Sequence, residues 1–274
     1  MRSPVIRNPR AITASSFAAM FFLGIGYSII GAAARNLGLT PEQIGILLAV
    51  QNVGFGVSVA VSGALADTHS KPRIIAFGSI ITAIAFFAFF RTQVFWINAL
   101  VMVLVGVGTG TYEGVADAML FDLHERRAAT FVNANHLFVT IGSALIAIYL
   151  IFLSQAWRIA LVQAALAVAV LAVIFAAVRM KQAHGIKTTF GDKMAAIARS
   201  RLILILFIAI VMCAGVEAAA IGLLSTYLAD LRNFAPLAAQ LGLVVMYAGM
   251  IAGRVIVGAL VRPAGDGLFK EAFR

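Results

Sequence analysis

Residues 202–228 read LILILFIAIVMCAGVEAAAIGLLSTYL, an apolar run whose one charged residue is Glu217. A helix needs about 20 mostly apolar residues to cross the hydrocarbon core of a bilayer, so this stretch is long enough to span a membrane. The whole chain of 274 residues has the same character, since 62% of its residues are hydrophobic and 12% are Asp, Glu, Lys or Arg. Soluble domains contain about 25% charged residues. The sequence therefore predicts an integral membrane protein.

Apolar runs of this kind recur along the chain, and we expect each to form one transmembrane helix. They are residues 14–34, 43–66, 73–90, 94–118, 131–153, 157–178, 202–228 and 237–260. The first run follows three arginines, as a signal peptide does, but its apolar stretch is longer than a typical signal core. We therefore predict eight transmembrane helices.

The basic residues are distributed unequally between the two sides of the predicted spans. With the N-terminus in the cytoplasm, sixteen Lys and Arg fall on the cytoplasmic side, and four fall on the other side, one in each loop. Cytoplasmic loops carry the excess of Lys and Arg in membrane proteins. We expect a multi-pass protein of the cell (inner) membrane with both ends in the cytoplasm, and the net charge of +10 then needs no nucleic acid partner.

The longest connection, RMKQAHGIKTTFGDKMAAIARSR at 179–201, is basic and follows six spans. Six spans and a long basic loop are typical of a transporter built from two halves, although an ordinary long loop of another polytopic protein would look the same. We predict a six-helix N-terminal bundle over 1–178, a cytoplasmic interdomain loop over 179–201, and a partial C-terminal bundle of two helices over 202–274.

An internal repeat supports this division. Segment 53–65, VGFGVSVAVSGAL, matches segment 248–260, AGMIAGRVIVGAL, at an offset that also aligns Pro41 with Pro236. Gly and Ala are common in membrane helices, so some of these matches could arise by chance. A true repeat implies that the second half holds the first two of six helices, and we expect the sequence to be C-terminally incomplete.

The second span ends in GALADTHSKPR at 63–73. This stretch resembles the loop signature of the major facilitator superfamily at Gly63, Leu65, Asp67, Lys71 and Arg73. The resemblance implies the all-α major facilitator fold, with eight of its helices present. In that family the Asp caps a neighbouring helix and the basic residues hold the inward gate, which makes Gly63, Asp67, Lys71 and Arg73 the candidate gate motif.

A narrower resemblance involves Glu113 in the fourth span and the stretch NANHLFVTIG at 133–142, together with AGVE at 214–217 and STYL at 225–228. These elements are similar to those of the fucose–proton symporter and glucose/mannose permease-like branch. The resemblance implies a sugar as substrate and a proton-coupling role for Glu113. Asp117 replaces the Asn usual in that branch, and the first span lacks its Asp, so facilitated diffusion remains open.

Two carboxylates lie well inside predicted spans, Glu113 and Glu217. A charge in the bilayer core costs at least about 2.5–3.5 kcal/mol, so such a residue faces a cavity, finds a partner or is neutralised. Because burial favours the neutral form of a carboxyl group, both are candidates for proton coupling. Alternatively, Glu113 forms a structural hydrogen-bond network with Asn133 or His136, and Glu217 forms a salt bridge with Arg254.

Five polar residues are candidates for contact with a small polar solute. They are Gln51, Asn52, Tyr27, Asn133 and His136. Amide side chains offer both donors and acceptors, which suits a hydroxyl-rich ligand. The alternatives are hydrogen bonding between helices for the two amides of the second span, positioning of helices for Asn133 and His136, and packing for Tyr27.

We therefore expect a secondary transporter of a small polar solute, with a sugar as the first choice and protons as a candidate coupling ion. An exporter of drugs or metabolites from the same superfamily and a truncated, non-transporting fragment are the alternatives. Motifs for metal-dependent or nucleophilic catalysis and for nucleotide binding are absent from the sequence, so we expect no enzyme activity, no cofactor, no metal and no nucleotide. The single cysteine, Cys213, excludes an internal disulfide.

Overall fold

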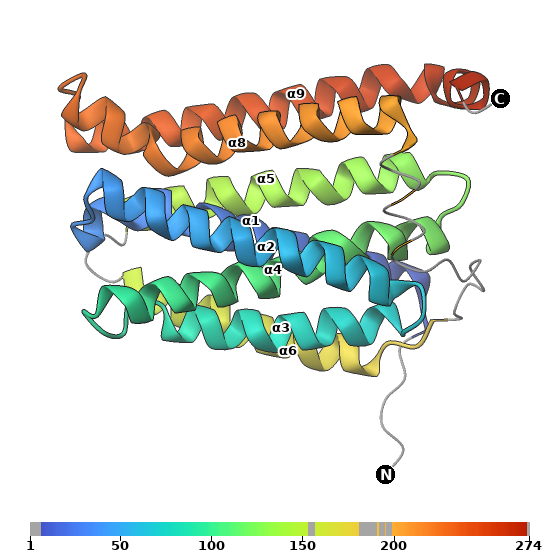
Figure 1. Ribbon diagram of the computed structural model, residues 1–274, viewed down its shortest axis with the longest axis horizontal. Helices are drawn as coiled ribbons and strands as arrows, with labels where there is room; N and C mark the ends of the chain where they lie inside the picture. The colour runs from blue at the N-terminus through green and yellow to red at the C-terminus, as the bar shows by residue number, and fades with distance from the viewer. Residues whose placement is uncertain (1–6, 153–156, 181–190, 192–194, 196–198, 273–274) are drawn as a thin grey trace, which may run out of the picture.

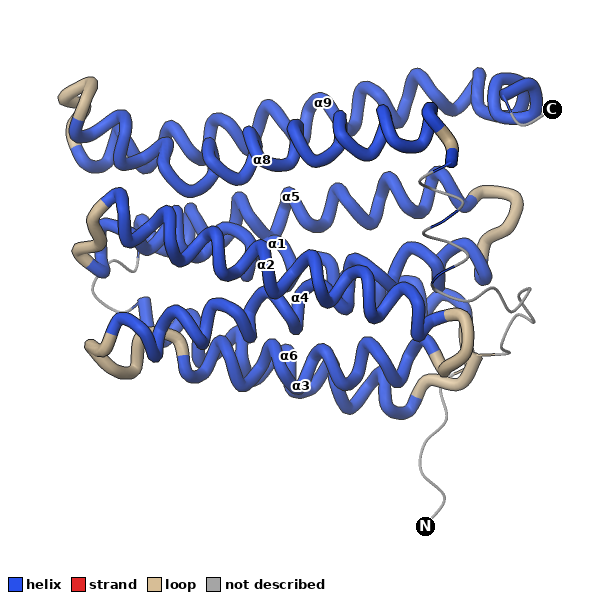
Figure 2. The backbone as a smooth tube through the Cα atoms, viewed as in Figure 1, coloured by secondary structure: helices blue, strands red, loops and turns tan. Residues whose placement is uncertain are grey.

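The computed structural model describes residues 7–152, 157–180, 191, 195 and 199–272. In these residues the chain forms eight long helices. Figure 2 shows helices joined by loops, with no strand among the described residues. The helices are α1 (Pro9–Leu37), α2 (Pro41–Ala66), α3 (Lys71–Ala88), α4 (Phe95–Leu123), α5 (Ala128–Phe152), α6 (Trp157–Ala177), α8 (Arg201–Asp230) and α9 (Pro236–Ala272). Each is long and apolar enough to cross a membrane, which confirms the predicted all-α membrane fold.

Several helices extend beyond the apolar runs that predicted them. Helix α4 continues to Leu123 rather than ending near 118, and α9 continues to Ala272 rather than ending at 260. Hydropathy locates the part of a helix that crosses the hydrocarbon core, whereas backbone hydrogen bonding continues through polar residues once a helix has formed. The predicted interdomain loop at 179–201 lies largely outside the described residues.

The starts of α2 and α9 share the proline that the repeat aligned. Pro41 and Pro236 are the first residues of their helices, where the fixed φ of proline suits a helix and its missing N–H costs nothing. Before Pro41, Thr40 accepts a hydrogen bond from the backbone N–H of Gln43, and the Gln43 side chain accepts one from the Thr40 N–H. This reciprocal pair fixes the point at which α2 begins.

The first six helices form one packed bundle, with α8 and α9 lying side by side along one edge of it (Figure 1). Helix α2 packs most extensively along α4, α1 along α5, and α3 along both α4 and α6. Helices α8 and α9 reach the bundle through α1, α2 and α5. The largest group of buried apolar side chains draws mainly on the first six helices and includes Ile221 of α8 and Tyr247 of α9.

Glycines of α4 bring its backbone into contact with its neighbours. A Cβ atom built on Gly106 would overlap the carbonyl oxygen of Gln51, and those on Gly110 and Gly114 would crowd the same helix further along. These three glycines recur every four residues and therefore lie on the face of α4 that meets α2. Small residues at this spacing let two membrane helices approach closely, since packing replaces the hydrophobic effect in lipid.

Helix α8 touches the bundle through its C-terminal half. Every side chain described from Arg201 to Val216 is exposed, whereas Ile221 and Ser225 are buried. Here the Ser225 hydroxyl donates to the carbonyl of Gly31 at 3.3 Å, and a Cβ on Gly31 would overlap the carbonyl of Ile221. Contact between α1 and α8 is thus concentrated at the end of the bundle opposite the start of α1.

Candidate functional site

Three ionisable side chains of α4 and α5 meet at the face of the bundle that looks toward α9. The Asp117 carboxylate lies 3.0 Å from His136 Nε2 through one oxygen and accepts a hydrogen bond of 2.7 Å from Asn135 Nδ2 through the other. Glu113 Oε1 lies 4.0 Å from the same His136 nitrogen. We call Glu113, Asp117 and His136 the acid–histidine cluster.

Sequence spacing explains why the cluster forms. Glu113 and Asp117 are four residues apart and therefore lie on one face of α4. Asn135 and His136 are adjacent on α5, so both reach the α4 side where the helices cross. Asn135 is completely buried and also accepts a hydrogen bond of 3.3 Å from the Ser16 hydroxyl of α1. The amide thus ties three helices together and holds Asp117 in place beside His136.

The three members of the cluster keep part of their surface open. The side chains of Glu113, Asp117 and His136 are 30%, 23% and 27% exposed. A solute or a water molecule can therefore reach them. A histidine side chain beside two carboxylates provides groups that can bind and release protons.

Helices α1, α8 and α9 carry further polar residues in the neighbourhood of Glu113. Arg254 of α9 and Glu217 of α8 both lie within electrostatic range of Glu113. Tyr27 of α1 interacts with Glu113 and Glu217 in the same way. Together with α4 and α5, which carry the cluster, these three helices place acidic, basic and hydroxyl groups in one region between the six-helix bundle and the α8–α9 pair.

The partners of these residues differ in part from those predicted. Glu113 approaches His136, as the structural alternative proposed, while Asn133 instead donates a long hydrogen bond of 3.5 Å to the backbone carbonyl of Arg254. In the described part of the chain, Glu217 and Arg254 form no ion pair with each other.

The two amides of α2 lie away from the cluster. Gln51 is buried and donates a hydrogen bond of 2.9 Å to the carbonyl of Gly26 on α1. Asn52 is exposed and bonds the carbonyl of Leu48 in its own helix at 2.8 Å. The position of Gln51 agrees with the interhelical alternative, and Asn52 faces outward from the bundle.

The loop motif lies at the end of the bundle where α1 begins. Lys71 donates a hydrogen bond of 2.5 Å to Asp122 at the end of α4, and this ion pair is mostly buried. Arg73 is exposed, Asp67 is the C-cap residue of α2, and Gly63 packs beside Gly114. Through Lys71, the motif joins the start of α3 to the end of α4.

Sequence analysis did not identify two residues that bond across helix contacts, Asp122 and Tyr247. Asp122 lies beside a charged loop. The sequence indicated only that it is an acidic residue on the same predicted side of the membrane as Lys71. Tyr247 is the other, since its hydroxyl hydrogen bonds Ser28 at 2.6 Å across the contact between α9 and α1. A tyrosine inside a span was its only signal.

Within the described ranges, no three His, Cys, Asp or Glu side chains are grouped to hold a metal ion.

Comparison with known proteins gives the family. Over 117 residues the chain is 30% identical to a protein of Salmonella typhimurium (strain LT2) named phosphoglycerate transporter protein. That match covers 41% of this chain and 25% of the relative, so the chain spans about a quarter of the length of the curated relative it matches. The model of the Major Facilitator Superfamily matches residues 12–269. Together with its membrane-spanning helices, this match shows that the chain belongs to the Major Facilitator Superfamily of membrane transporters.

Proposed function

We propose that this chain takes part in secondary transport of a small polar solute, with a sugar as the substrate and proton exchange at Glu113. Its six-helix bundle (1–178) and its second unit (202–274) move relative to each other around the acid–histidine cluster, joined by the loop at 179–201. Transport by rocking of two halves around a site at the membrane midplane is common among secondary transporters. The proposal places the protein in the inner membrane with both ends in the cytoplasm.

The observation that carries the proposal is the acid–histidine cluster. Its carboxylates and imidazole lie partly open between the bundle and the α8–α9 pair, where a change in the distance between the two units would change their surroundings. An ionisable group within a membrane span is expensive to keep, and it commonly marks a substrate or proton pathway. Of the two carboxylates beside His136, that of Glu113 lies farther from the imidazole, at 4.0 Å against 3.0 Å for Asp117. Because Glu113 is held less closely by His136, we assign the proton exchange to it.

The sugar assignment depends on the resemblance of Glu113, 133–142 and 214–217 to the fucose–proton symporter and glucose/mannose permease-like branch. The site chemistry is compatible with it, because carboxylates, a tyrosine hydroxyl and an arginine together supply both acceptors and donors for hydroxyl groups. Tyr27 and Arg254 are the candidate donors, and Glu217 is a candidate acceptor.

A second candidate substrate follows from the Salmonella relative, which is named a phosphoglycerate transporter. A phosphorylated acid would pair with Arg254 and a protonated His136. The three acids Glu113, Asp117 and Glu217 would repel it, which is why a neutral sugar is the first choice. A counterflow experiment that includes both kinds of solute separates the two candidates.

The test is solute counterflow with the full chain reconstituted into proteoliposomes, using labelled fucose, glucose, mannose and 3-phosphoglycerate. We expect counterflow of at least one of the sugars and accumulation of that sugar when an inward proton gradient is imposed. The variant Glu113→Gln should keep counterflow and lose gradient-driven accumulation. The matched control is Glu42→Gln, because Glu42 is exposed in the first turn of α2.

Each other outcome argues against part of the proposal. No counterflow with any of the four solutes would contradict transport of these substrate classes by this chain. Exchange of 3-phosphoglycerate alone would replace the sugar by the second candidate. Accumulation that persists in Glu113→Gln would remove the proton-exchange role from Glu113.

A further inference from the structure

A cavity of about 510 Å³ lies at the end of the bundle where α1 begins. Its walls come from Arg7 and Ile12 at the start of α1, from the end of α4, and from Arg179 and Met180, which follow α6. None of the three residues of the acid–histidine cluster lines it. The cavity is therefore distinct from the proposed transport site, and it lies on the side of the membrane that we predict to be cytoplasmic.

Two arginines with unused donors line this cavity. Both Arg7 and Arg179 are exposed, so their guanidinium groups are accessible to a ligand. Arg179 Nη1 donates to the carbonyls of Ala176 at 2.9 Å and Val178 at 3.2 Å, which holds the guanidinium at the C-terminal end of α6. Its other two nitrogens, and the whole guanidinium of Arg7, make no hydrogen bond or ion pair with a described residue. Such free edges suit a carboxylate or a phosphate.

An acid also lines the cavity, but its charge is compensated. Asp122 accepts a hydrogen bond of 2.5 Å from Lys71, and this pair is mostly buried. The loop between α4 and α5 adds further net positive charge at the same end, since it carries Arg126 and Arg127 against Glu125. The cavity thus keeps the positive charge of its two arginines and favours an anionic ligand.

The position of the cavity corresponds to the headgroup region of a bilayer. The predicted span of α6 ends one residue before Arg179, and that of α1 begins seven residues after Arg7. Helix α6 packs mainly on α3 and α1, and Leu166, Val170 and Val173 on its free side are 64%, 60% and 70% exposed. These three residues recur every three or four positions, so they form one apolar stripe that an acyl chain can cover.

We propose that this cavity binds the headgroup phosphate of an anionic phospholipid, with Arg7 and Arg179 donating to the phosphate oxygens. Leu123 and Met180 supply the apolar part of the lining, beside which the glycerol and the first acyl carbons lie. Basic pockets between membrane helices on the cytoplasmic side are typical sites for anionic headgroups. A free phosphate ester carries the same charged group without acyl chains, so the test compares the two sources. The inference does not depend on the proposed transport activity.

Native mass spectrometry of the full chain in detergent measures the affinity of each bound lipid. The chain is titrated with phosphatidylglycerol and, in parallel, with phosphatidylcholine, whose choline cancels the charge of the phosphate. A third titration adds sn-glycerol 3-phosphate to the phosphatidylglycerol complex at equal concentration. We expect one phosphatidylglycerol to bind more tightly than the rest, phosphatidylcholine to bind at least about fivefold more weakly, and glycerol 3-phosphate not to displace the lipid.

Substitution of the two arginines tests their role. Arg7→Gln should weaken binding of the first phosphatidylglycerol about fivefold, which is the contribution of one arginine near an anionic lipid surface. Adding Arg179→Gln should weaken it about twentyfold in total. Arg7 precedes α1 and has no partner among the described residues. Arg7→Gln alone therefore tests the site even if the loss of Arg179 disturbs the end of α6.

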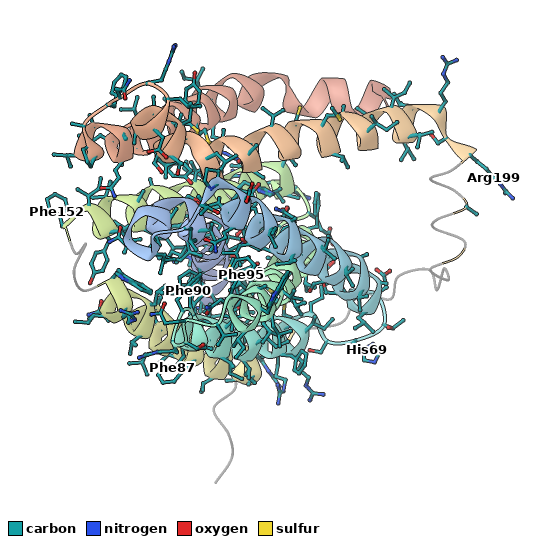
Figure 3. The ribbon with its side chains drawn as sticks, turned by 60° about the vertical axis from the view of Figure 1, so that its left-hand side comes forward. His69, Phe87, Phe90, Phe95, Phe152 and Arg199 are labelled. Carbon is teal, nitrogen blue, oxygen red and sulfur yellow. The ribbon has the colours of Figure 1, made fainter. Side chains whose placement is uncertain are left out.

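The matched control is Arg91→Gln combined with Arg158→Gln, which removes the same charge from two exposed arginines at the opposite end of the bundle. Arg91 lies 4.7 Å from the centre of the Phe87 ring. Figure 3 labels Phe87 at that end and His69, in the turn between α2 and α3, at the end that carries the cavity. Because distant charges are screened, the control should leave the affinity within about twofold.

Four results would overturn the proposal. They are equal affinity for the two lipids, unchanged binding when both Arg7 and Arg179 are replaced, an equal loss of affinity in the control pair, and displacement of the lipid by glycerol 3-phosphate. The third result would mean that the lipid responds to net charge alone. The fourth would assign the cavity to a free phosphate ester instead of a lipid.

Discussion

Asn135 on α5 donates a hydrogen bond of 2.7 Å to Asp117 on α4, and this bond sets the geometry of the acid–histidine cluster. The adjacent residue, His136, approaches the second oxygen of the same carboxylate at 3.0 Å. One carboxylate thus connects a completely buried amide to a partly exposed imidazole. The buried side of the cluster holds the structure, and the open side is available for chemistry.

The first prediction concerns Asn135. Replacement by Ala should lower the free energy of unfolding by about 1–3 kcal/mol, because it leaves one oxygen of Asp117 and the Ser16 hydroxyl without their buried partner. The thermal midpoint in detergent measures the effect. Asn52→Ala is the control, since Asn52 is exposed and bonds its own helix, and its midpoint should stay close to that of the unmodified chain. Equal losses in the two variants would contradict the role given to Asn135.

A second prediction concerns the ion pair between Lys71 and Asp122, whose side chains are 15% and 22% exposed. A double-mutant cycle with Lys71→Met and Asp122→Asn should give a coupling energy of about 1–2 kcal/mol, between the values for exposed and buried pairs. Chemical denaturation or thermal midpoints supply the four free energies. Arg73→Met, on the exposed side of the same turn, should change stability by less than about 0.5 kcal/mol. A coupling energy near zero would show that the pair does not tie α3 to α4.

Glycine packing between α2 and α4 leads to a third prediction. Gly106→Ala should destabilise the protein by about 1–3 kcal/mol, because the new methyl group would meet the backbone of Gln51 and force the helices apart. Gly56→Ala is the matched control. A Cβ at Gly56 has no atom within 4 Å, and alanine is the better helix former, so this variant should be neutral or more stable. The order of the two thermal midpoints is the test, and the reverse order would contradict the close crossing.

The fourth prediction concerns the contact between α9 and α1. Tyr247→Phe removes the buried hydrogen bond of 2.6 Å to Ser28 and keeps the ring, so it should cost about 0.5–1.5 kcal/mol of stability. Tyr227→Phe serves as the control, because Tyr227 is exposed. If Tyr247→Phe and Tyr227→Phe melt at the same temperature, the hydrogen bond does not hold α9 against the bundle.

The membrane-spanning elements could be predicted from local properties. Whether a run such as 202–228 or 157–178 crosses a bilayer depends on the transfer of its own side chains and backbone from water to lipid, which is a sum over neighbouring residues. The start of α2 is also decided locally, because Thr40, Pro41 and Gln43 interact within one turn, although the apolar run began only at residue 43. These features need no knowledge of which helices are neighbours, and for that reason the eight helices were found.

The partners within the site depend on distances that hydropathy does not contain. Glu113 and Asp117 could be placed on one face of α4 from their spacing, but that this face meets Asn135 and His136 depends on how α4 and α5 are rotated against each other. Asp122 and Tyr247 found their partners 51 and 219 residues away. Gln51 was equally suited to a ligand or to a neighbouring helix, and the close approach of α2 to Gly26 of α1 turned it inward. A polar side chain in a span must satisfy its hydrogen bonds somewhere, and the packing of the helices is what determines where.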